Sequence, residues 1–330
     1  MSSAWRNVNK SGARRGSDPL KAWSPVTVAE EQDLTVLVAE GGPFHNLPTL
    51  ADACRRLIRE ELTKASHENA RDRLSQLDWR SFFVEATLQR WRTPSPHPRS
   101  IETCPEFDQE VRALAPEDQA AVAEILAGIE RGDDLSPLLS RWATKAHPKR
   151  ADRLLADWHL HHIHIRPGSG ELLFVHMDTR TARMVAVRPH ESWAELELVH
   201  RVQRAWPGLI FSGFIGGVRP SRIVPDDELR ALQQAGVNVI LPDEQGLALM
   251  GRGITGSGHP MVLIDGANAL EHRLRELEEG LVVEDATVWT PCLSEDFGAL
   301  GLLNAKEERI LWVARLWPFG PQTPRQSDDR

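Results

Sequence analysis

The stretch WHLHHIHIRPGSGELLFVHMDTRTARMVAVRP, residues 158–189, decides the fold of the middle of the chain. It contains three runs with the composition of β-strands, at residues 158–165, 171–178 and 182–189. The glycine-containing segment RPGSG joins the first two runs and favours a hairpin, and the segment DTRT leads into the third. The sequence therefore predicts a meander of three antiparallel strands.

Helices are predicted on both sides of this meander. Residues 105–134 read as two helices that are separated at Pro116, and the second carries apolar residues at helical spacing. Residues 191–206 give a further helical pattern that ends at Pro207 and Gly208. Helices next to an antiparallel sheet make an α+β domain, which we expect to span residues 101–208.

The rest of the chain has regions of different composition. The N-terminal part is helical in pattern, a run with three prolines follows it, and short strand patterns with one strong helix lie beyond residue 209. We therefore expect a multi-domain α+β protein with a flexible tail at 1–25, a helical region at 26–92, a linker at 93–100, the α+β domain at 101–208, a small α/β region at 209–318 and a second flexible tail at 319–330.

The composition limits the class of protein. The 330 residues are 41% hydrophobic and 26% charged, which is enough apolar material for more than one core. The net charge of −8 argues against non-specific coating of nucleic acid. Cys54, Cys104 and Cys292 form no disulfide or zinc pattern. No run reaches the roughly 18 to 20 apolar residues of a membrane span, and no secretory signal is visible, so we expect a cytoplasmic protein that does not bind membranes.

Histidine is the strongest chemical signal in the chain. Seven of the 13 histidines fall between residues 159 and 200. Because side chains alternate along a strand, His162 and His164 should share one face of the first strand, while Ile163 and Ile165 face the core. Neutral imidazoles can bind Zn²⁺, and imidazoles near their ordinary pKa of about 6.5 can act as general base and general acid. Half-buried structural histidines are the non-functional alternative.

Other side chains could complete such a site. His190 follows the third strand, where it should be exposed at the edge of the sheet. Arg183 and Arg188 belong to the same strand, and their odd separation predicts opposite faces, so that one of them would contact a phosphate group. For the zinc alternative, the predicted ligands are His162, His164 and His176.

Three strings carry a resemblance to a known family: FDQEVRALAPEDQAAVAEILAGI for the paired helices, DWHLHHIHIRPGSGELLFVHMD for the hairpin, and MVAVRPHESW for the last strand and its histidine. Residues 104–207 resemble the RelE/ParE-like toxin superfamily. The resemblance implies a domain that cleaves RNA, or that acts on gyrase as the ParE branch does. It implies that His190 occupies the terminal catalytic position, and that His162, His164 and Arg183 or Arg188 are its partners on the sheet.

The sequence thus predicts a toxin-like endoribonuclease that cleaves RNA by metal-independent acid and base catalysis, needs no cofactor and is controlled by an antitoxin or another inhibitor protein. Its alternatives are a non-catalytic interaction protein with the same fold and a zinc hydrolase. The most basic short segment of the chain offers the residues expected to bind RNA, namely Arg141, Lys145, Lys149, Arg150 and Arg153.

One glycine-rich segment lies outside this scheme. Residues 251–260, GRGITGSGHP, invite comparison with phosphate-binding loops. No lysine follows at the spacing of a Walker motif, and no clear helix pattern completes a dinucleotide-binding motif. We expect a tight turn or hairpin here.

Overall fold

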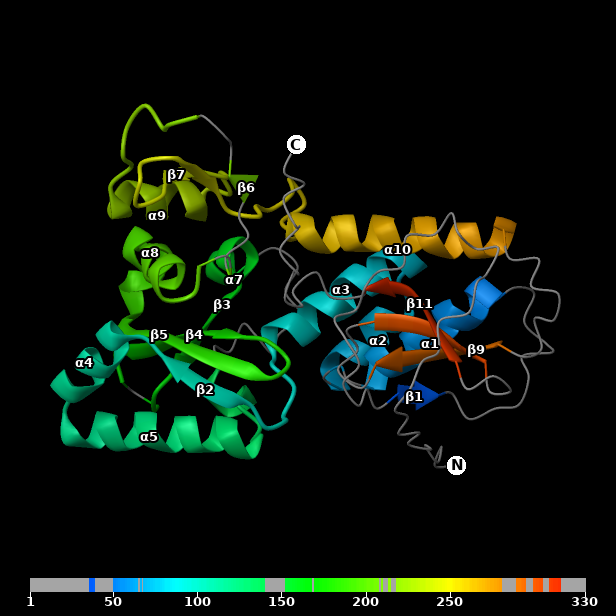
Figure 1. Ribbon diagram of the computed structural model, residues 1–330, viewed down its shortest axis with the longest axis horizontal. Helices are drawn as coiled ribbons and strands as arrows, with labels where there is room; N and C mark the ends of the chain where they lie inside the picture. Colours follow the sequence, from blue (N-terminus) through cyan, green and yellow to red (C-terminus); the bar gives the residue numbers. More distant parts are fainter. Residues whose placement is uncertain are drawn as a thin grey trace. The chain divides into compact units, whose positions relative to one another are not determined.

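The computed structural model describes residues 36–38, 50–64, 66, 68–139, 152–167, 169–207, 209, 213–214, 218–280, 289–294, 299–304 and 309–315. Helices and sheets are both present, so the predicted α+β class is confirmed (Figure 1). The chain forms two compact units. The first consists of Met1–Ala65, Leu77–Phe83 and Asp265–Arg330, and the second of Ser66–Gln76 and Val84–Ile264. Among the described residues, no helix is long and apolar enough to span a membrane.

The first unit contains a four-stranded antiparallel sheet in the order β1-β9-β10-β11. Its strands are β1 (Val36–Val38), β9 (Trp289–Ser294), β10 (Ala299–Asn304) and β11 (Arg309–Arg315). Helix α1 (Leu50–Lys64) belongs to the same unit and buries Ala53, Cys54 and Leu57, the face that its apolar spacing predicts. Segments from both ends of the chain therefore share one sheet, and this division cuts across the consecutive regions expected from composition.

The second unit is built around a sheet in the order β2-β5-β4-β3. Its strands are β2 (Ser100–Thr103), β3 (Leu160–His164), β4 (Glu171–Met177) and β5 (Thr181–Pro189). Strands β3, β4 and β5 pair antiparallel, which confirms the predicted meander, and β2 joins β5 in parallel. The two predicted helices before the meander are also confirmed, as α4 (Pro105–Ala113) and α5 (Pro116–Arg131). Each starts with a proline at its first turn, where no intrahelical N–H donor is needed.

Further elements of the second unit surround this sheet. They are α2 (Glu68–Ser75), η1 (Ser136–Leu138), α7 (Arg153–Trp158), η2 (His190–Ala194), α8 (Leu196–Ala205), β6 (Gly213–Phe214), α9 (Asp226–Gln234), β7 (Ile240–Pro242) and β8 (Ala248–Met250). Strands β6, β8 and β7 form a small antiparallel sheet. Two helices, α3 (Trp79–Arg92) and α10 (Met261–Gly280), contribute residues to both units.

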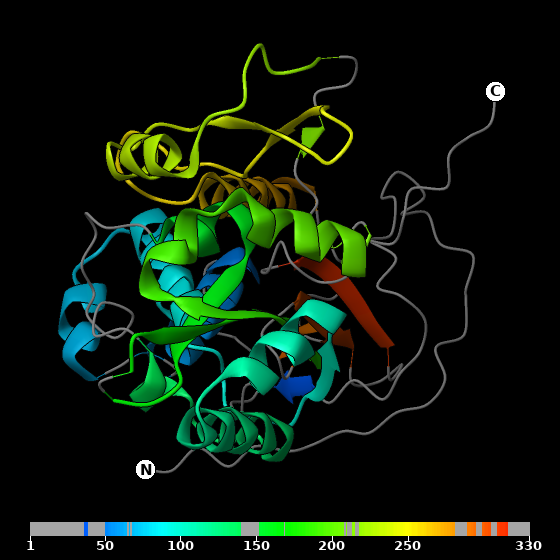
Figure 2. The same ribbon diagram turned by 90° about the vertical axis from the view of Figure 1, so that its left-hand side faces the viewer.

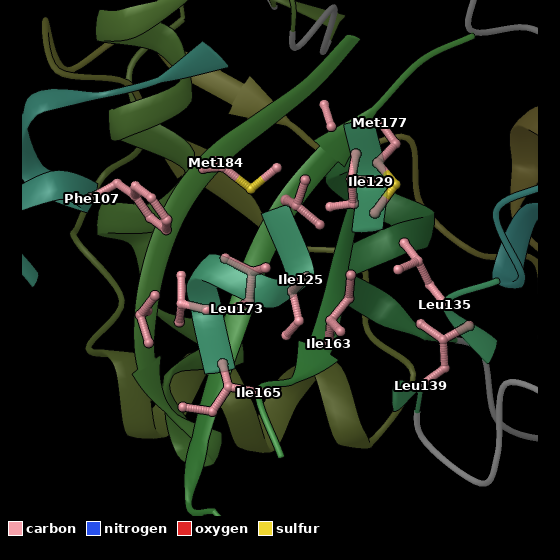
Figure 3. Packing of buried hydrophobic residues seen from close by; sticks show 14 of the residues in the cluster. Phe107, Ile125, Ile129, Leu135, Leu139, Ile163, Ile165, Leu173, Met177 and Met184 are labelled. Carbon is pink, nitrogen blue, oxygen red and sulfur yellow. The ribbon is translucent and has the colours of Figure 1, made fainter. Parts of the chain in front are cut away.

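Both faces of the central sheet are covered by apolar layers. On one face, Ile163, Leu173 and Met184 pack with side chains of α4 and α5 such as Phe107 and Ile125 (Figure 3). The other face, with Leu160, Leu172 and Phe174, packs against α7, α8, α9 and the strands β7 and β8. Figure 2 shows the same layers from the side, with α8 and α9 on one side of the sheet and α5 on the other. The sheet is therefore the central layer of the second unit.

Candidate active site

Strand β3 places its histidines in two different environments. Ile163 and Ile165 are buried in the cluster beneath α4 and α5, as the alternating pattern predicts. His162 and His164 point to the opposite side and are half-buried. This side of the sheet is partly covered. Helices α7, α8 and α9 and strands β7 and β8 bury their own apolar residues against it, so β3 is accessible only in part, toward its end at His164.

The three predicted catalytic histidines lie near this accessible end. We call His162, His164 and His190 the edge trio. The rings of His164 and His190 have their centroids 6.2 Å apart and their planes 28° apart. His162 is two residues from His164 on the same side of β3, which corresponds to about 6 to 7 Å. The backbone N–H of His190 donates a hydrogen bond of 3.0 Å to the carbonyl oxygen of Gly170, so the hairpin turn fixes the position of His190.

The edge trio is electrostatically coupled. Partial burial lowers the pKa of His164 below its ordinary 6.5, and the nearby imidazoles of His162 and His190 lower it further. His190 is exposed at the start of η2. The pair therefore combines a half-buried imidazole that prefers the neutral form with an exposed imidazole.

Asp152 joins the site, although the sequence analysis did not select it. Its Oδ1 accepts a hydrogen bond of 3.1 Å from the backbone N–H of Leu155, which caps α7. Its Oδ2 lies 3.3 Å from Nδ1 of His162. The cap anchors the carboxylate close to the His162 ring, although this contact does not have the geometry of a hydrogen bond. An aspartate immediately before a helical pattern is a recognisable N-cap signal, but nothing in the sequence connects it to His162.

Three other histidines form a separate group, the buried trio of His159, His161 and His176. Nδ1 of His159 lies 3.2 Å from Nε2 of His176, and their rings meet edge to face with centroids 4.8 Å apart. Burial lowers the pKa of His161 to about 3 and that of His176 to about 4, and it lowers the pKa of His159 well below 6.5. These side chains are neutral near pH 7 and are shielded from water.

The zinc alternative required His162, His164 and His176 to converge, and they do not. His176 lies opposite Leu160 on β3, and its ring contacts His159. Within the described ranges, no three histidine, cysteine, aspartate or glutamate side chains are grouped so that they could hold a metal ion. The separation arises because the strand register places Phe174, an apolar residue, opposite His162.

The two candidate arginines lie on the same face of β5, and the prediction of opposite faces is wrong. Between Ala186 and Met184 the register with β4 shifts, which leaves Val185 as an extra residue in a β-bulge. The bulge changes the alternation, so that Arg183 pairs with His176 and Arg188 with Leu172, two residues of the same side of β4.

Both arginines are already engaged by carboxylates. Arg183 binds Glu102 and Asp178 at 3.0 and 2.6 Å. Arg188 binds Glu110 and Glu195 at 2.9 and 3.2 Å. Arg188 is also separated from His164 by strand β4, a distance of about 10 Å. Neither guanidinium is placed to contact a phosphate group at the edge trio.

The basic segment predicted to bind RNA can be followed only at its end. Arg153 is buried, forms an ion pair of 3.0 Å with Asp157 and donates hydrogen bonds to Asn238 and Val237. It therefore stabilises the interior of the unit, and its expected role at the surface is wrong. The other members, Arg141, Lys145, Lys149 and Arg150, lie outside the described residues.

The edge trio is the part of the predicted site that the fold brings together at an accessible place. Two imidazoles with different access to water can accept a proton from one atom of a substrate and donate a proton to another. In comparisons with family models, with curated proteins and with solved structures, no match to this chain was found. The case for a function therefore depends on these side chains.

Proposed function

We propose that the second unit is a metal-independent endoribonuclease whose catalytic residues are His164 and His190. The observation that supports this most is the pair of rings with centroids 6.2 Å apart. At this separation both imidazoles lie close enough to reach the same phosphodiester. The order of elements, with α4 and α5 before a three-stranded meander and His190 after it, is the order that a RelE-like toxin would have.

In the proposed reaction, the role of His164 follows from the protonation state that its environment favours. His164, whose pKa is lowered, accepts the proton of a ribose 2′-hydroxyl, and the 2′-oxygen attacks the phosphorus. His190 donates a proton to the departing 5′-oxygen. The products are a 2′,3′-cyclic phosphate and a 5′-hydroxyl end, and a metal ion has no role in either step.

Charge stabilisation in this proposal comes from imidazole groups. Arg183 and Arg188 each bind two carboxylates, so their charge is compensated within the protein. His162, whose Nδ1 lies 3.3 Å from Asp152, is on the same side of β3 as His164, and we assign it to donate a hydrogen bond to a phosphate oxygen.

The test uses the purified full chain and a single-stranded RNA in the presence of EDTA. We expect cleavage that yields cyclic phosphate and 5′-hydroxyl ends, and we expect His164→Gln and His190→Gln each to reduce the rate by roughly a hundredfold or more. His272→Gln is the matched control, because His272 is exposed on α10 and its ring contacts Glu276. The control should cleave at the rate of the unmodified chain.

The other outcomes decide between the alternatives. Cleavage that EDTA abolishes would favour a zinc hydrolase, and the absence of cleavage in all conditions would favour an interaction protein. Expression in bacterial cells tests the toxin part of the proposal. Growth arrest that His164→Gln and His190→Gln relieve would support a toxin that requires an antitoxin partner, and harmless expression of an active enzyme would contradict it.

A further inference from the structure

The glycine-rich segment 251–260 is a rigid hairpin loop in the second unit. Ile254 and Pro260 form a β-bridge, and the backbone N–H of Thr255 donates to the carbonyl oxygen of His259 at 2.8 Å. The side chain of Asn238 holds the backbone of Ile254 through both its amide oxygen and its amide nitrogen, each at 3.0 Å. The loop is therefore held in one conformation by bonds at its base.

Two glycines are required at the base of this loop. Gly253 has a φ of +77°, in the left-handed region that favours glycine, and its N–H donates a hydrogen bond of 2.9 Å to the buried carboxylate of Asp157. At Gly251 an added Cβ would lie only 2.7 Å from the side chain of Asp157. The glycines that suggested a phosphate-binding loop thus serve the close approach of two backbone segments.

The tip of the loop carries Ser257, whose Oγ lies 2.8 Å from Oγ1 of Thr255 and also contacts a histidine of the same loop. Oγ of Ser257 lies 3.1 Å from Nδ1 of His259. Nε2 of the same ring lies 3.0 Å from Oε1 of Glu85, a residue of α3 that is 174 positions away in the sequence. The second oxygen of Glu85 accepts a hydrogen bond of 2.9 Å from Arg73. The order is hydroxyl, imidazole, carboxylate, guanidinium.

The carboxylate of this chain is suited to keep its charge. Burial raises the pKa of Glu85, but hydrogen bonds from His259 and Arg73 outweigh burial, and the resulting pKa is lower than the ordinary value. A charged Glu85 fixes the orientation of the imidazole ring and stabilises the imidazolium that forms when the ring accepts a proton.

The serine is open to solvent while its partners are not. Ser257 is exposed, whereas the side chains of His259 and Glu85 are only 18% and 11% exposed. An added Cβ at the neighbouring Gly256 would meet no atom within 4 Å. A reactive group in solution can therefore approach Oγ of Ser257 without displacing part of the protein.

We propose that Ser257 is a nucleophile activated by His259 and positioned through Glu85, and that it accepts acyl groups from small carboxylic esters. A serine and a base in hydrogen-bond contact, with a third group that orients the base, is the arrangement that nucleophilic catalysis requires. A neutral ester is the expected class of substrate, because Arg73, the cation among these hydrogen-bonded groups, is already engaged with Glu85. The site shares no residue with the edge trio, and the proposal does not depend on the ribonuclease.

The ester and water supply every atom that the reaction consumes, and the proton returns to its starting place. Oγ of Ser257 forms a bond to the carbonyl carbon, and Nδ1 of His259 takes the hydroxyl proton and passes it to the departing alcohol. Water then attacks the acyl-serine, the same nitrogen takes a proton from the water, and the serine oxygen recovers a proton as the carboxylic acid leaves.

The experiment treats the full chain with a fluorophosphonate probe, from which an activated serine displaces fluoride. We expect labelling of the native chain at a single serine, which peptide mass spectrometry identifies as Ser257, and no labelling of the heat-denatured chain. Ser257→Ala should abolish labelling and His259→Gln should slow it by roughly a hundredfold. Ser221→Ala is the matched control, since Ser221 is an exposed serine elsewhere in the unit.

Glu85 is tested as a positioning residue through the pH dependence of labelling. Glu85→Gln should slow labelling by roughly tenfold at pH 7 and move the acid limb of the pH–rate profile to lower pH, because a neutral amide no longer stabilises the imidazolium. Thermal melting of each variant shows that the fold is retained. Labelling of native chain no faster than denatured chain, labelling at another serine, or equal labelling of Ser257→Ala would overturn the proposal.

Discussion

The edge trio and the buried trio both have members on β3 but have opposite chemical properties. His161 and His162 are neighbours in the sequence, yet the pKa of His161 falls to about 3 while His162 lies half-exposed beside Asp152. His164 ends β3 and His176 lies on the paired strand β4, yet His176 contacts His159 in the interior and His164 faces His190. Whether an imidazole can transfer protons in this protein depends on its position along the sheet, and the identity of the residue does not decide it.

The comparison shows how the fold assigns histidines to structure or to chemistry. A histidine at the end of β3 and β4 that lies away from the hairpin turn is buried and remains neutral, whereas one near the turn keeps access to solvent. The histidines that are concentrated in this part of the sequence therefore include two populations, one buried and one accessible to solvent. The following predictions test whether the two populations differ as described.

The largest expected effect is a loss of stability in acid through the buried trio. The pKa values of His159, His161 and His176 are below 6.5 in the folded chain and near 6.5 in the unfolded chain. Above pH 6.5 both states are neutral and the trio contributes nothing. As the pH falls below 6.5 only the unfolded chain takes up protons, so stability should fall by up to about 1.4 kcal/mol per pH unit for each histidine, down to the folded pKa.

Urea denaturation between pH 7.5 and 4.5 measures this loss. Carboxylates contribute to acid denaturation as well, so the informative quantity is the difference between variants. His161→Leu removes one titrating ring and should reduce the dependence of unfolding free energy on pH, whereas His272→Leu, on the exposed face of α10, should not. Identical pH dependence in both variants would mean that His161 does not titrate on unfolding as its burial requires.

A smaller effect is expected at Arg188, which shares a face with His164 but is engaged with carboxylates. Arg188→Met removes ion pairs to Glu110 and Glu195 and should lower the free energy of unfolding by roughly 1 to 3 kcal/mol. RNA cleavage by the folded variant should change by less than about tenfold. Arg222→Met, which breaks an exposed pair with Glu228, is the control and should lower the free energy of unfolding much less than Arg188→Met does. A hundredfold loss of cleavage at unchanged stability would instead identify Arg188 as catalytic.

The smallest effect is expected at Asp152, which links α7 to the edge trio. Asp152→Asn keeps an oxygen that can accept the hydrogen bond from Leu155, but it removes the charge beside His162. We expect a loss of roughly tenfold in cleavage rate with a change in unfolding free energy below about 0.5 kcal/mol. Asp152→Ala should cost about 1 kcal/mol more in stability, because the cap is lost as well. Cleavage unaffected by both variants would exclude a role for this carboxylate.

The local sequence pattern was sufficient to predict the meander and its neighbouring helices in the second unit. The strands of the meander, the break at Pro116 and the burial of Ile163 and Ile165 all follow from periodicity and turn residues, and the structure confirms them. The glycine-rich segment 251–260 was expected to be a tight turn or hairpin, and the bridge between Ile254 and Pro260 closes it. These features depend on neighbouring residues, which is why a sequence read in short windows contains them.

Features that depend on distant segments could not be read in this way. The bulge at Val185, which places Arg183 and Arg188 on one face, depends on the pairing of β5 with β4. The contact between Asp152 and His162 requires α7 to lie beside β3, and the contact between His259 and Glu85 joins residues 174 positions apart.

The amino-acid sequence by itself determined where strands and helices form and how many histidines lie on the meander, because alternation, helical spacing, proline and glycine act locally along the backbone. Only the tertiary structure decided which imidazoles reach water, which arginines are neutralised and which serine meets a histidine and a carboxylate. Those properties arise from desolvation and from charges brought together across the sheet and its covering layers. Both are set by the packing of segments that are far apart in the chain.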